Sequence, residues 1–278
     1  MKIVVSVDME GLTGVCRPEQ VQGGEAGEFQ SRKIPEGIEL MIGDVNATVA
    51  GLAKAGVDDI IVWDAHFRSF NAPLARLHPA ARYLFGGSPN GLRFQYLDRK
   101  TDGLILLGYH AKAGTKHAVL EHTMTSIEWL KVKVNGREIG ELGWDAALAG
   151  AVGVPVIMAS GDDKFCAEAH EFLGPDVVAV CVKQAIARHA ALCLPPAKTA
   201  EMLAAGAAEA VKRIGKVKCF DFGSPVTVEI THKHTYLADQ ADLRVHNGRR
   251  IDGYTVAWTA KDFATWAGFT TDNPPPQG

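Results

Sequence analysis

Acidic and histidine side chains follow short apolar runs, in positions where they could bind a metal ion. Four such residues are Asp8, Glu10, His66 and His110. Extended backbone places Asp8 and Glu10 on one face, about 7 Å apart at Cα. Buried carboxylates that lie close together repel one another unless a cation or a proton intervenes. Carboxylate and imidazole ligands without thiolate suit zinc or manganese in a catalytic site.

Each of these residues also has an ordinary structural interpretation. An aspartate at a strand end, such as Asp8 or Asp64, is commonly a turn or helix-capping residue. Glu10 alone is typical of a solvated loop, and a lone histidine after a strand is often only hydrogen bonded. Glu141, between Gly140 and Leu142-Gly143, is a further candidate ligand, or a first-turn glutamate favoured by the helix dipole.

Two loop histidines, His117 and His122, could act as acid/base or nucleophile because imidazole titrates near pH 7. Spacing alone does not choose between them. Asp162 and Lys183 are candidates to line the pocket, with helix capping and a surface salt bridge as the alternatives.

The elements that must position these residues are predicted from hydrophobic periodicity. Residues 2–7, 59–63 and 104–107 are short apolar runs typical of strands buried on both faces. Apolar residues of 38–52 recur at helical spacing between the first two. Strand, helix and strand in this order favour a parallel sheet, whose ligands bind beyond the carboxyl ends of the strands. We therefore expect an α/β fold, a largely parallel sheet flanked by helices in three layers.

The remaining chain continues this alternation and then changes character. Asn135-Gly136 predicts a type I′ hairpin within 132–139. Helices are expected over 142–152, 164–172 and 198–213, and strands over 155–159, 177–182, 225–231 and 255–259. We predict three parts: a metal-binding α/β domain over 1–193, a smaller α+β domain over 194–271, and a disordered tail over 272–278.

Composition excludes several classes of protein. The 278 residues are 47% hydrophobic and carry a formal net charge of −3, which disfavours disorder and nucleic acid as a partner. No apolar run is long enough to span a membrane, and residues 2–7 are too short for a signal peptide. Five dispersed cysteines without a CxxC pair indicate a reducing compartment, so we expect a cytoplasmic protein. HExxH, P-loop, GxGxxG and GxSxG motifs are absent.

Several motifs occur together in a characteristic order. They are Ser6-Val-Asp-Met-Glu-Gly11, Asp64-Ala-His66, Leu107-Gly-Tyr-His-Ala111, Glu121-His-Thr-Met124 and Gly140-Glu-Leu-Gly143. Together they closely resemble the zinc-dependent D-aminopeptidases, self-compartmentalising bacterial peptidases. The resemblance continues through Gly161-Asp162-Asp163 and Val182-Lys183-Gln184 and weakens beyond about residue 198.

The resemblance implies a site with two zinc ions. Asp8 would bridge them, Glu10 and His66 would complete one ion, and His110 and Glu141 the other. His122 matches the catalytic histidine of the family. With one bridging hydroxide, three carboxylates and two divalent ions sum to zero charge, so such a cluster can be buried. The family also implies a homodecamer built from stacked pentameric rings around a chamber.

The leading hypothesis is a dinuclear zinc aminopeptidase that hydrolyses short peptides with a metal-activated water, assisted by His122. The resemblance suggests substrates with an amino-terminal D-residue, and the sequence leaves stereochemistry and peptide length open. One alternative is a metal-dependent amidohydrolase of a non-peptide or β-amino acid amide. Another is a non-catalytic α/β module that binds a polyol or a ribose without metal.

Overall fold

The computed structural model describes most of the chain. The described residues are 1–21, 34–67, 69, 71–86, 93–94 and 96–269. The predicted tail over 272–278 lies outside them.

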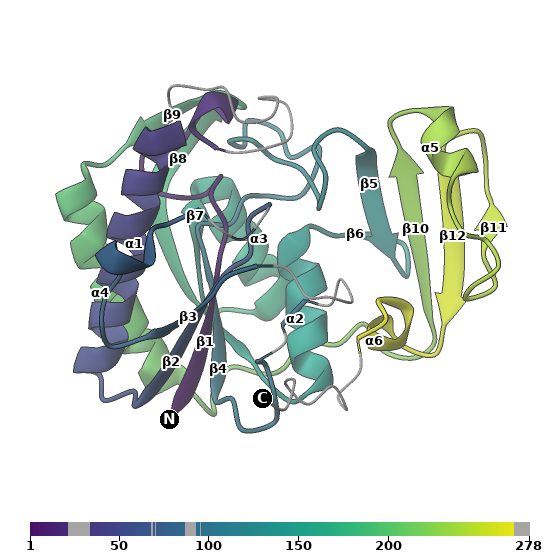
Figure 1. The fold of residues 1–278 in the computed structure, drawn as a ribbon. Helices are drawn as coiled ribbons and strands as arrows, with labels where there is room; N and C mark the ends of the chain where they lie inside the picture. The colour runs from purple at the N-terminus through teal and green to yellow at the C-terminus, as the bar shows by residue number, and fades with distance from the viewer. Residues whose placement is uncertain (22–33, 68, 70, 87–92, 95, 270–278) are drawn as a thin grey trace.

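A seven-stranded sheet forms the middle layer of the larger part of the molecule (Figure 1). Its strands are β1 (Lys2–Val7), β2 (Asp59–Asp64), β3 (Arg82–Leu84), β4 (Gly103–Leu107), β7 (Val156–Asp162), β8 (Val178–Ala187) and β9 (Ala190–Cys193). They lie in the order β3-β2-β1-β4-β7-β8-β9, and every neighbouring pair is parallel except β8 with β9. The predicted fold class is confirmed.

Helices cover both faces of this sheet because its central strands are apolar on both sides. α1 (Ile34–Lys54) and α4 (Pro196–Arg213) pack together on one face (Figure 1). α2 (Glu141–Ala151) and α3 (Asp163–Leu173) lie on the other. Alternate residues of each strand enter two separate cores, as Val4 and Val5 do in β1. The result is the predicted three-layer arrangement.

The strand order reverses between β1 and β4. The chain goes from β1 through α1 to β2 on one side, and β4 then pairs with the opposite side of β1. Loops that follow β1 and β4 therefore leave the sheet in different directions and open a crevice at its carboxyl edge. This is the edge at which the sequence places its candidate ligands.

A second, antiparallel sheet lies beside the first (Figure 1). Its strands are β5 (Trp129–Val134), β6 (Arg137–Glu138), β10 (Val226–His232), β11 (Arg249–Arg250) and β12 (Thr255–Ala260). The short helices are α5 (Thr235–Asp239), α6 (Phe263–Trp266), η1 (Pro18–Gln20) and η3 (Leu74–Arg76). Asn135 and Gly136 have φ of 51° and 80°, as the predicted type I′ turn between β5 and β6 requires.

The antiparallel sheet draws its strands from two distant stretches of the chain. β5 and β6 precede α2, whereas β10 to β12 follow α4, which packs on the parallel sheet. The division into parts at residues 193 and 194 stays a prediction. Among the described residues, none of the helices is long and apolar enough to cross a membrane.

Gly11 allows the loops after β1 and β4 to touch. Its N–H donates to the Gly108 carbonyl at 2.7 Å. A Cβ at this position would lie 1.8 Å from the carbonyl oxygen of Tyr109, which belongs to the backbone and has no rotamer to change. The close approach fixes the distance between Glu10 on one loop and His110 on the other.

Substitution Gly11→Ala is expected to lower the free energy of unfolding by roughly 3 kcal/mol or more, because the backbones must separate. Urea denaturation measures the loss. Gly43→Ala is the matched control: its Cβ would meet nothing within 4 Å on an exposed face of α1. That variant should gain about 0.5–1 kcal/mol from helix propensity. Equal stability of the two variants would contradict this account of Gly11.

Candidate metal centre

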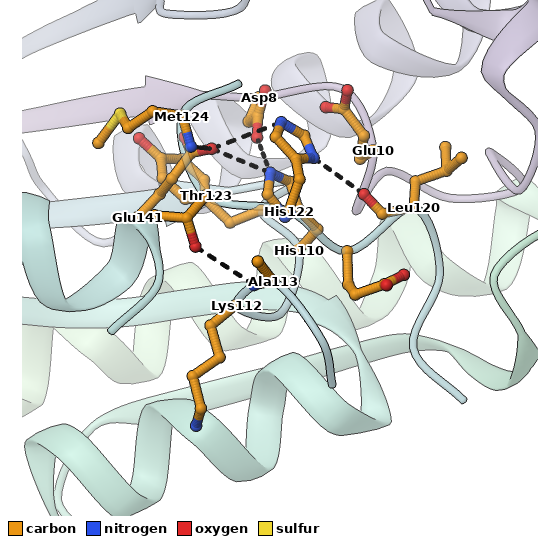
Figure 2. A network of polar contacts seen from close by, with 12 residues as sticks. Asp8, Glu10, His110, Lys112, Ala113, Leu120, His122, Thr123, Met124 and Glu141 are labelled. Atoms are coloured by element: carbon orange, nitrogen blue, oxygen red, sulfur yellow. Dashed lines mark hydrogen bonds and ion pairs between the residues drawn. The ribbon is translucent and has the colours of Figure 1, made fainter. Parts of the chain in front are cut away.

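Six predicted site residues converge at the crevice between β1 and β4. They are Asp8 and Glu10 after β1, His66 after β2, His110 after β4, His122 in the following loop, and Glu141 at the start of α2. Five are buried and His122 is half-buried. Figure 2 shows Asp8 and Glu141 beside the stacked rings of His110 and His122.

The distances between their polar atoms match those within a metal-ligand set. His110 Nε2 lies 3.2 Å from Glu141 Oε1 and 3.4 Å from Asp8 Oδ2 (Figure 2). His66 Nε2 lies 3.4 Å from Glu10 Oε1. Two donor atoms of one tetrahedral zinc ion lie about 3.3 Å apart, since each is about 2.0–2.1 Å from the ion.

The described residues contain two overlapping groups of possible ligand atoms, and within each group all the atoms lie within 4.8 Å of one another. One joins Asp8, Glu10 and His110, and the other joins His110, His122 and Glu141. His66 contacts Glu10 at the edge of the first group. The structure thus brings together all the predicted ligands and also places His122 at ligand distance.

Four buried polar atoms at the centre have no hydrogen-bond partner among the described residues. Asp8 Oδ2, Glu10 Oε2, His66 Nδ1 and His110 Nε2 are all in this state. Such groups are costly to bury unless something satisfies them. Three anionic carboxylates and neutral imidazoles form the donor set that zinc prefers. The residues present therefore fit a divalent metal centre.

Charge coupling within the cluster shifts the pKa of each group. Burial raises the pKa of Asp8 to about 7, and neighbouring Glu10 adds to the rise. Burial opposes ionisation of Glu10 and Glu141 too, but His66 holds the pKa of Glu10 well below its usual range and His110 lowers that of Glu141 to about 2. Against burial, Glu10 raises the pKa of His66 to about 9. The carboxylates thus favour protonation of the groups that face them. A bound divalent cation would supply the same positive charge.

His122 stacks on His110 with ring centroids 3.9 Å apart. Its Nδ1 lies 2.9 Å from the Leu120 carbonyl, which only an N–H can satisfy (Figure 2). Nε2 then carries the free lone pair and faces Glu141 Oε1 at 3.6 Å. Burial, together with the charge of His110, lowers the pKa of His122 and favours the neutral ring. His117, the other loop candidate, is exposed and does not line the pocket.

Glu141 is both a first-turn helix residue and a member of the cluster, so the two interpretations of the sequence are compatible. Gly140 is the N-cap of α2. Glu141 Oε1 accepts a hydrogen bond from the Met124 N–H at 2.9 Å, which ties the helix to the loop that carries His122. Partial positive charge at the helix start favours the anionic carboxylate.

Asp162 and Lys183, the two candidates for the pocket wall, are not among its lining residues. Asp162 caps α3 by accepting from the N–H groups of Lys164 and Phe165, as the alternative predicted. Lys183 is fully buried, which excludes the surface salt bridge, and its Nζ donates to the carbonyls of Glu10, Leu12 and Val15. These hydrogen bonds fix the position of the loop that carries Glu10.

Asp64 and Asn71 position the loop that carries His66, and of the two only Asn71 gave no signal in the sequence. Asp64 accepts hydrogen bonds from the backbone and side chain of Asn71 at 2.7 and 2.8 Å, and the Asn71 side chain also donates to the His66 carbonyl. Asp64 is therefore a turn residue that orients the His66 loop, as its structural interpretation predicted. Asn71 is missed because a buried loop amide looks like any surface asparagine in sequence.

A pocket of ≈ 340 Å³ opens over the cluster. Its wall includes Asp8, Glu10, His66, Arg93, His122 and Glu141. His110 lies beneath, 1% exposed. This volume suits a small ligand.

Comparison with known proteins agrees with the geometry. A family model described as D-aminopeptidase matches residues 1–270. The chain belongs to the D-aminopeptidase family. The D-aminopeptidase of Bacillus subtilis strain 168 is 33% identical over 262 residues, which are 94% of this chain and 92% of that protein.

A solved structure extends this D-aminopeptidase likeness to three dimensions. It is the zinc-dependent D-aminopeptidase DppA from Bacillus subtilis, a self-compartmentalizing protease. The TM-score is 0.87 at 33% identity, with 96% of this chain and 95% of that chain covered. The predicted family, and the predicted enzyme class of aminopeptidase, are confirmed.

Because Lys183 satisfies three buried carbonyls, Lys183→Met is expected to lower the free energy of unfolding by at least about 3 kcal/mol. Urea denaturation of the metal-free protein measures this. Lys198→Met, at an exposed lysine whose ion pair among the described residues is with exposed Glu201, should change stability by less than about 0.5 kcal/mol. A change as small in Lys183→Met would refute the structural role given to this lysine.

Proposed function

We propose that the protein is an aminopeptidase with two zinc ions per chain that acts on short peptides with an amino-terminal D-residue. The buried, unpartnered atoms of Asp8, Glu10 and His110 carry the proposal, since they face one another at ligand distance. The family and the zinc dependence of its solved relative support the choice of metal.

Asp8 would bridge the two ions, as the family resemblance implies. It groups with Glu10 and His110 at ligand distance, and its Oδ2 lies 3.4 Å from His110 Nε2. Glu10 and His66 would hold one ion beside it, and His110 and Glu141 the other. Bound zinc supplies a Lewis acid for the scissile carbonyl and lowers the pKa of water at the site. The assignment leaves His122 outside the ligand set, although its Nε2 lies within reach.

His122 moves protons in this proposal. The hydrogen bond from Nδ1 to the Leu120 carbonyl fixes the ring and leaves Nε2 as the atom that accepts a proton and passes it to the leaving amine. Stacking on His110 prevents the ring from rotating away. One of the two ions that these residues would hold could bind the free amine of the peptide, which would favour a free amino terminus.

The proposal includes self-assembly of this chain into a homodecamer in the cytoplasm. The solved relative is a self-compartmentalizing protease, which supports an oligomer. Exposed apolar side chains near β8 and β9, namely Ile186, Leu192 and Leu194, are typical of a surface covered by another subunit. All five cysteines are free thiols, which is usual in a reducing compartment.

Metal analysis of Asp8→Asn tests the proposal. The wild type should contain two zinc ions per chain and hydrolyse D-alanyl-D-alanine faster than its L,L enantiomer. Asp8→Asn should lose most of the zinc and the activity, because the bridging carboxylate is gone. His122→Gln is the matched variant: we expect full zinc content and a loss of about 10²–10⁴ in kcat.

Two results would overturn the assignment. Full zinc content and full peptidase activity in Asp8→Asn would reject the dinuclear centre. Loss of zinc in His122→Gln would make this histidine a ligand instead of a proton carrier.

A further inference from the structure

Arg93 lies in the wall of the pocket, and its guanidinium is held by a buried carboxylate. Nε and Nη2 donate to the two oxygens of Asp145, both at 2.7 Å. Asp145 Oδ2 also accepts from the Tyr109 hydroxyl at 2.7 Å, which in turn lies 2.7 Å from Ser6 Oγ. This network joins Arg93 to β1, to α2 and to the segment that carries His110.

Two aromatic rings pack against the same guanidinium. Its Cζ lies 5.4 Å from the centroid of Trp63 and 5.8 Å from that of Phe94. Asp145 is fully buried, whereas the Arg93 side chain is 22% exposed. The group is therefore charged, held in place by Asp145, and partly exposed in the pocket wall.

Within the part of the chain that the structure describes, Nη1 of Arg93 has no oxygen acceptor. Among the described residues, the acceptor within reach of Nη1 is the thioether of Met124, at 3.8 Å. A thioether is a weak acceptor, and Met124 also lines the pocket. Nη1 thus keeps donors available at a rigid position, which is how proteins recognise carboxylates.

Arg188, the other guanidinium in the pocket wall, is already engaged. Its Nη1 donates to both the carbonyl and a carboxylate oxygen of Glu121. The two arginines therefore differ. Nη1 of Arg188 is hydrogen bonded to Glu121, whereas Nη1 of Arg93 can still donate to a ligand in the pocket.

The position of Arg93 relative to the metal centre determines the length of peptide whose carboxylate can reach this arginine. Arg93 and the candidate ligand Glu141 line the same pocket. Met124 links them, because its thioether lies 3.8 Å from Arg93 Nη1 and its backbone N–H donates to Glu141 Oε1 at 2.9 Å. Successive residues of a peptide are about 3.8 Å apart. A carboxylate one residue beyond a scissile carbonyl at the metal centre lies in this neighbourhood.

We propose that Arg93 binds the free α-carboxylate of the substrate through Nη1, so that the enzyme prefers dipeptides with a free carboxyl end. The inference rests on the proposed peptidase function and adds the substrate class. The metal centre would bind the amino end of the dipeptide, and Arg93 attracts its carboxyl end. Recognition of both ends selects short substrates over the amino ends of longer chains.

The test compares a dipeptide with its carboxyl-terminal amide. Alanyl-alanine and alanyl-alanine amide, in the enantiomer that the wild type cleaves faster, share the scissile bond and the amino end. For the wild type, kcat/KM should favour the acid over the amide by roughly 10- to 100-fold. In Arg93→Met/Asp145→Asn, which leaves no buried carboxylate unpaired, this ratio should fall to about 1, mainly through KM.

Controls separate recognition from folding and from the reaction. The double variant should keep the zinc content of the wild type, and Arg188→Met/Glu121→Gln should keep the preference for the acid. A double variant that loses activity equally on both substrates, or that retains the wild-type ratio, overturns the proposal. So does loss of the preference in the Arg188 variant. If the wild type cleaves neither substrate, the proposed function itself fails.

A measurement on the wild type does not depend on variants that fold. The product alanine should inhibit at least about tenfold more strongly than alanine amide, since only alanine offers a carboxylate to Arg93. Equal inhibition by the two compounds would exclude recognition of the carboxylate.

Discussion

Mutual repulsion of buried carboxylates is the constraint on which the site depends. Asp8, Glu10 and Glu141 are all nearly enclosed, and their oxygens face imidazole nitrogens at 3.2–3.4 Å. Such anions stay buried only if positive charge lies among them. The shifted pKa values of Asp8 and His66 express the same demand, because the cluster favours protons where a cation would sit.

The scaffold places the cluster at the point where the strand order reverses, and nearby groups hold each loop in place. Gly11 lets the β1 and β4 loops meet at backbone contact. Lys183 fixes the loop after β1 by donating hydrogen bonds to three of its backbone carbonyls. Asp44 on α1 accepts a hydrogen bond from the Thr13 N–H of the same loop. A metal centre needs this rigidity because ligands must keep their positions to within a fraction of an ångström.

Much of this site can be predicted from sequence because strand ends in a parallel sheet share an edge. Apolar runs locate β1, β2 and β4, and the residues that follow them converge by topology alone. Glu141 is found since glycines flank it at a helix start. Motif order adds the role of His122, which spacing could not distinguish from that of exposed His117.

The rest depends on tertiary contacts that no local pattern encodes. Lys183 resembles a surface lysine in sequence, although three carbonyls surround it. Arg93 and Asp145 are 52 residues apart, and only the fold reveals their pairing. β5 pairs with β10, which follows it in the chain only after the intervening α/β segment. The short strands β3, β9 and β11 have no strong hydrophobic pattern, and pairing with neighbouring strands determines their conformation.

Anomalous X-ray diffraction at the zinc absorption edge, from crystals of the zinc-loaded protein, tests the central claim most directly. We expect two peaks in each chain that share Asp8, one beside Glu10 and His66 and the other beside His110 and Glu141. The absence of any peak within the cluster, in crystals whose zinc content is confirmed, would contradict the account.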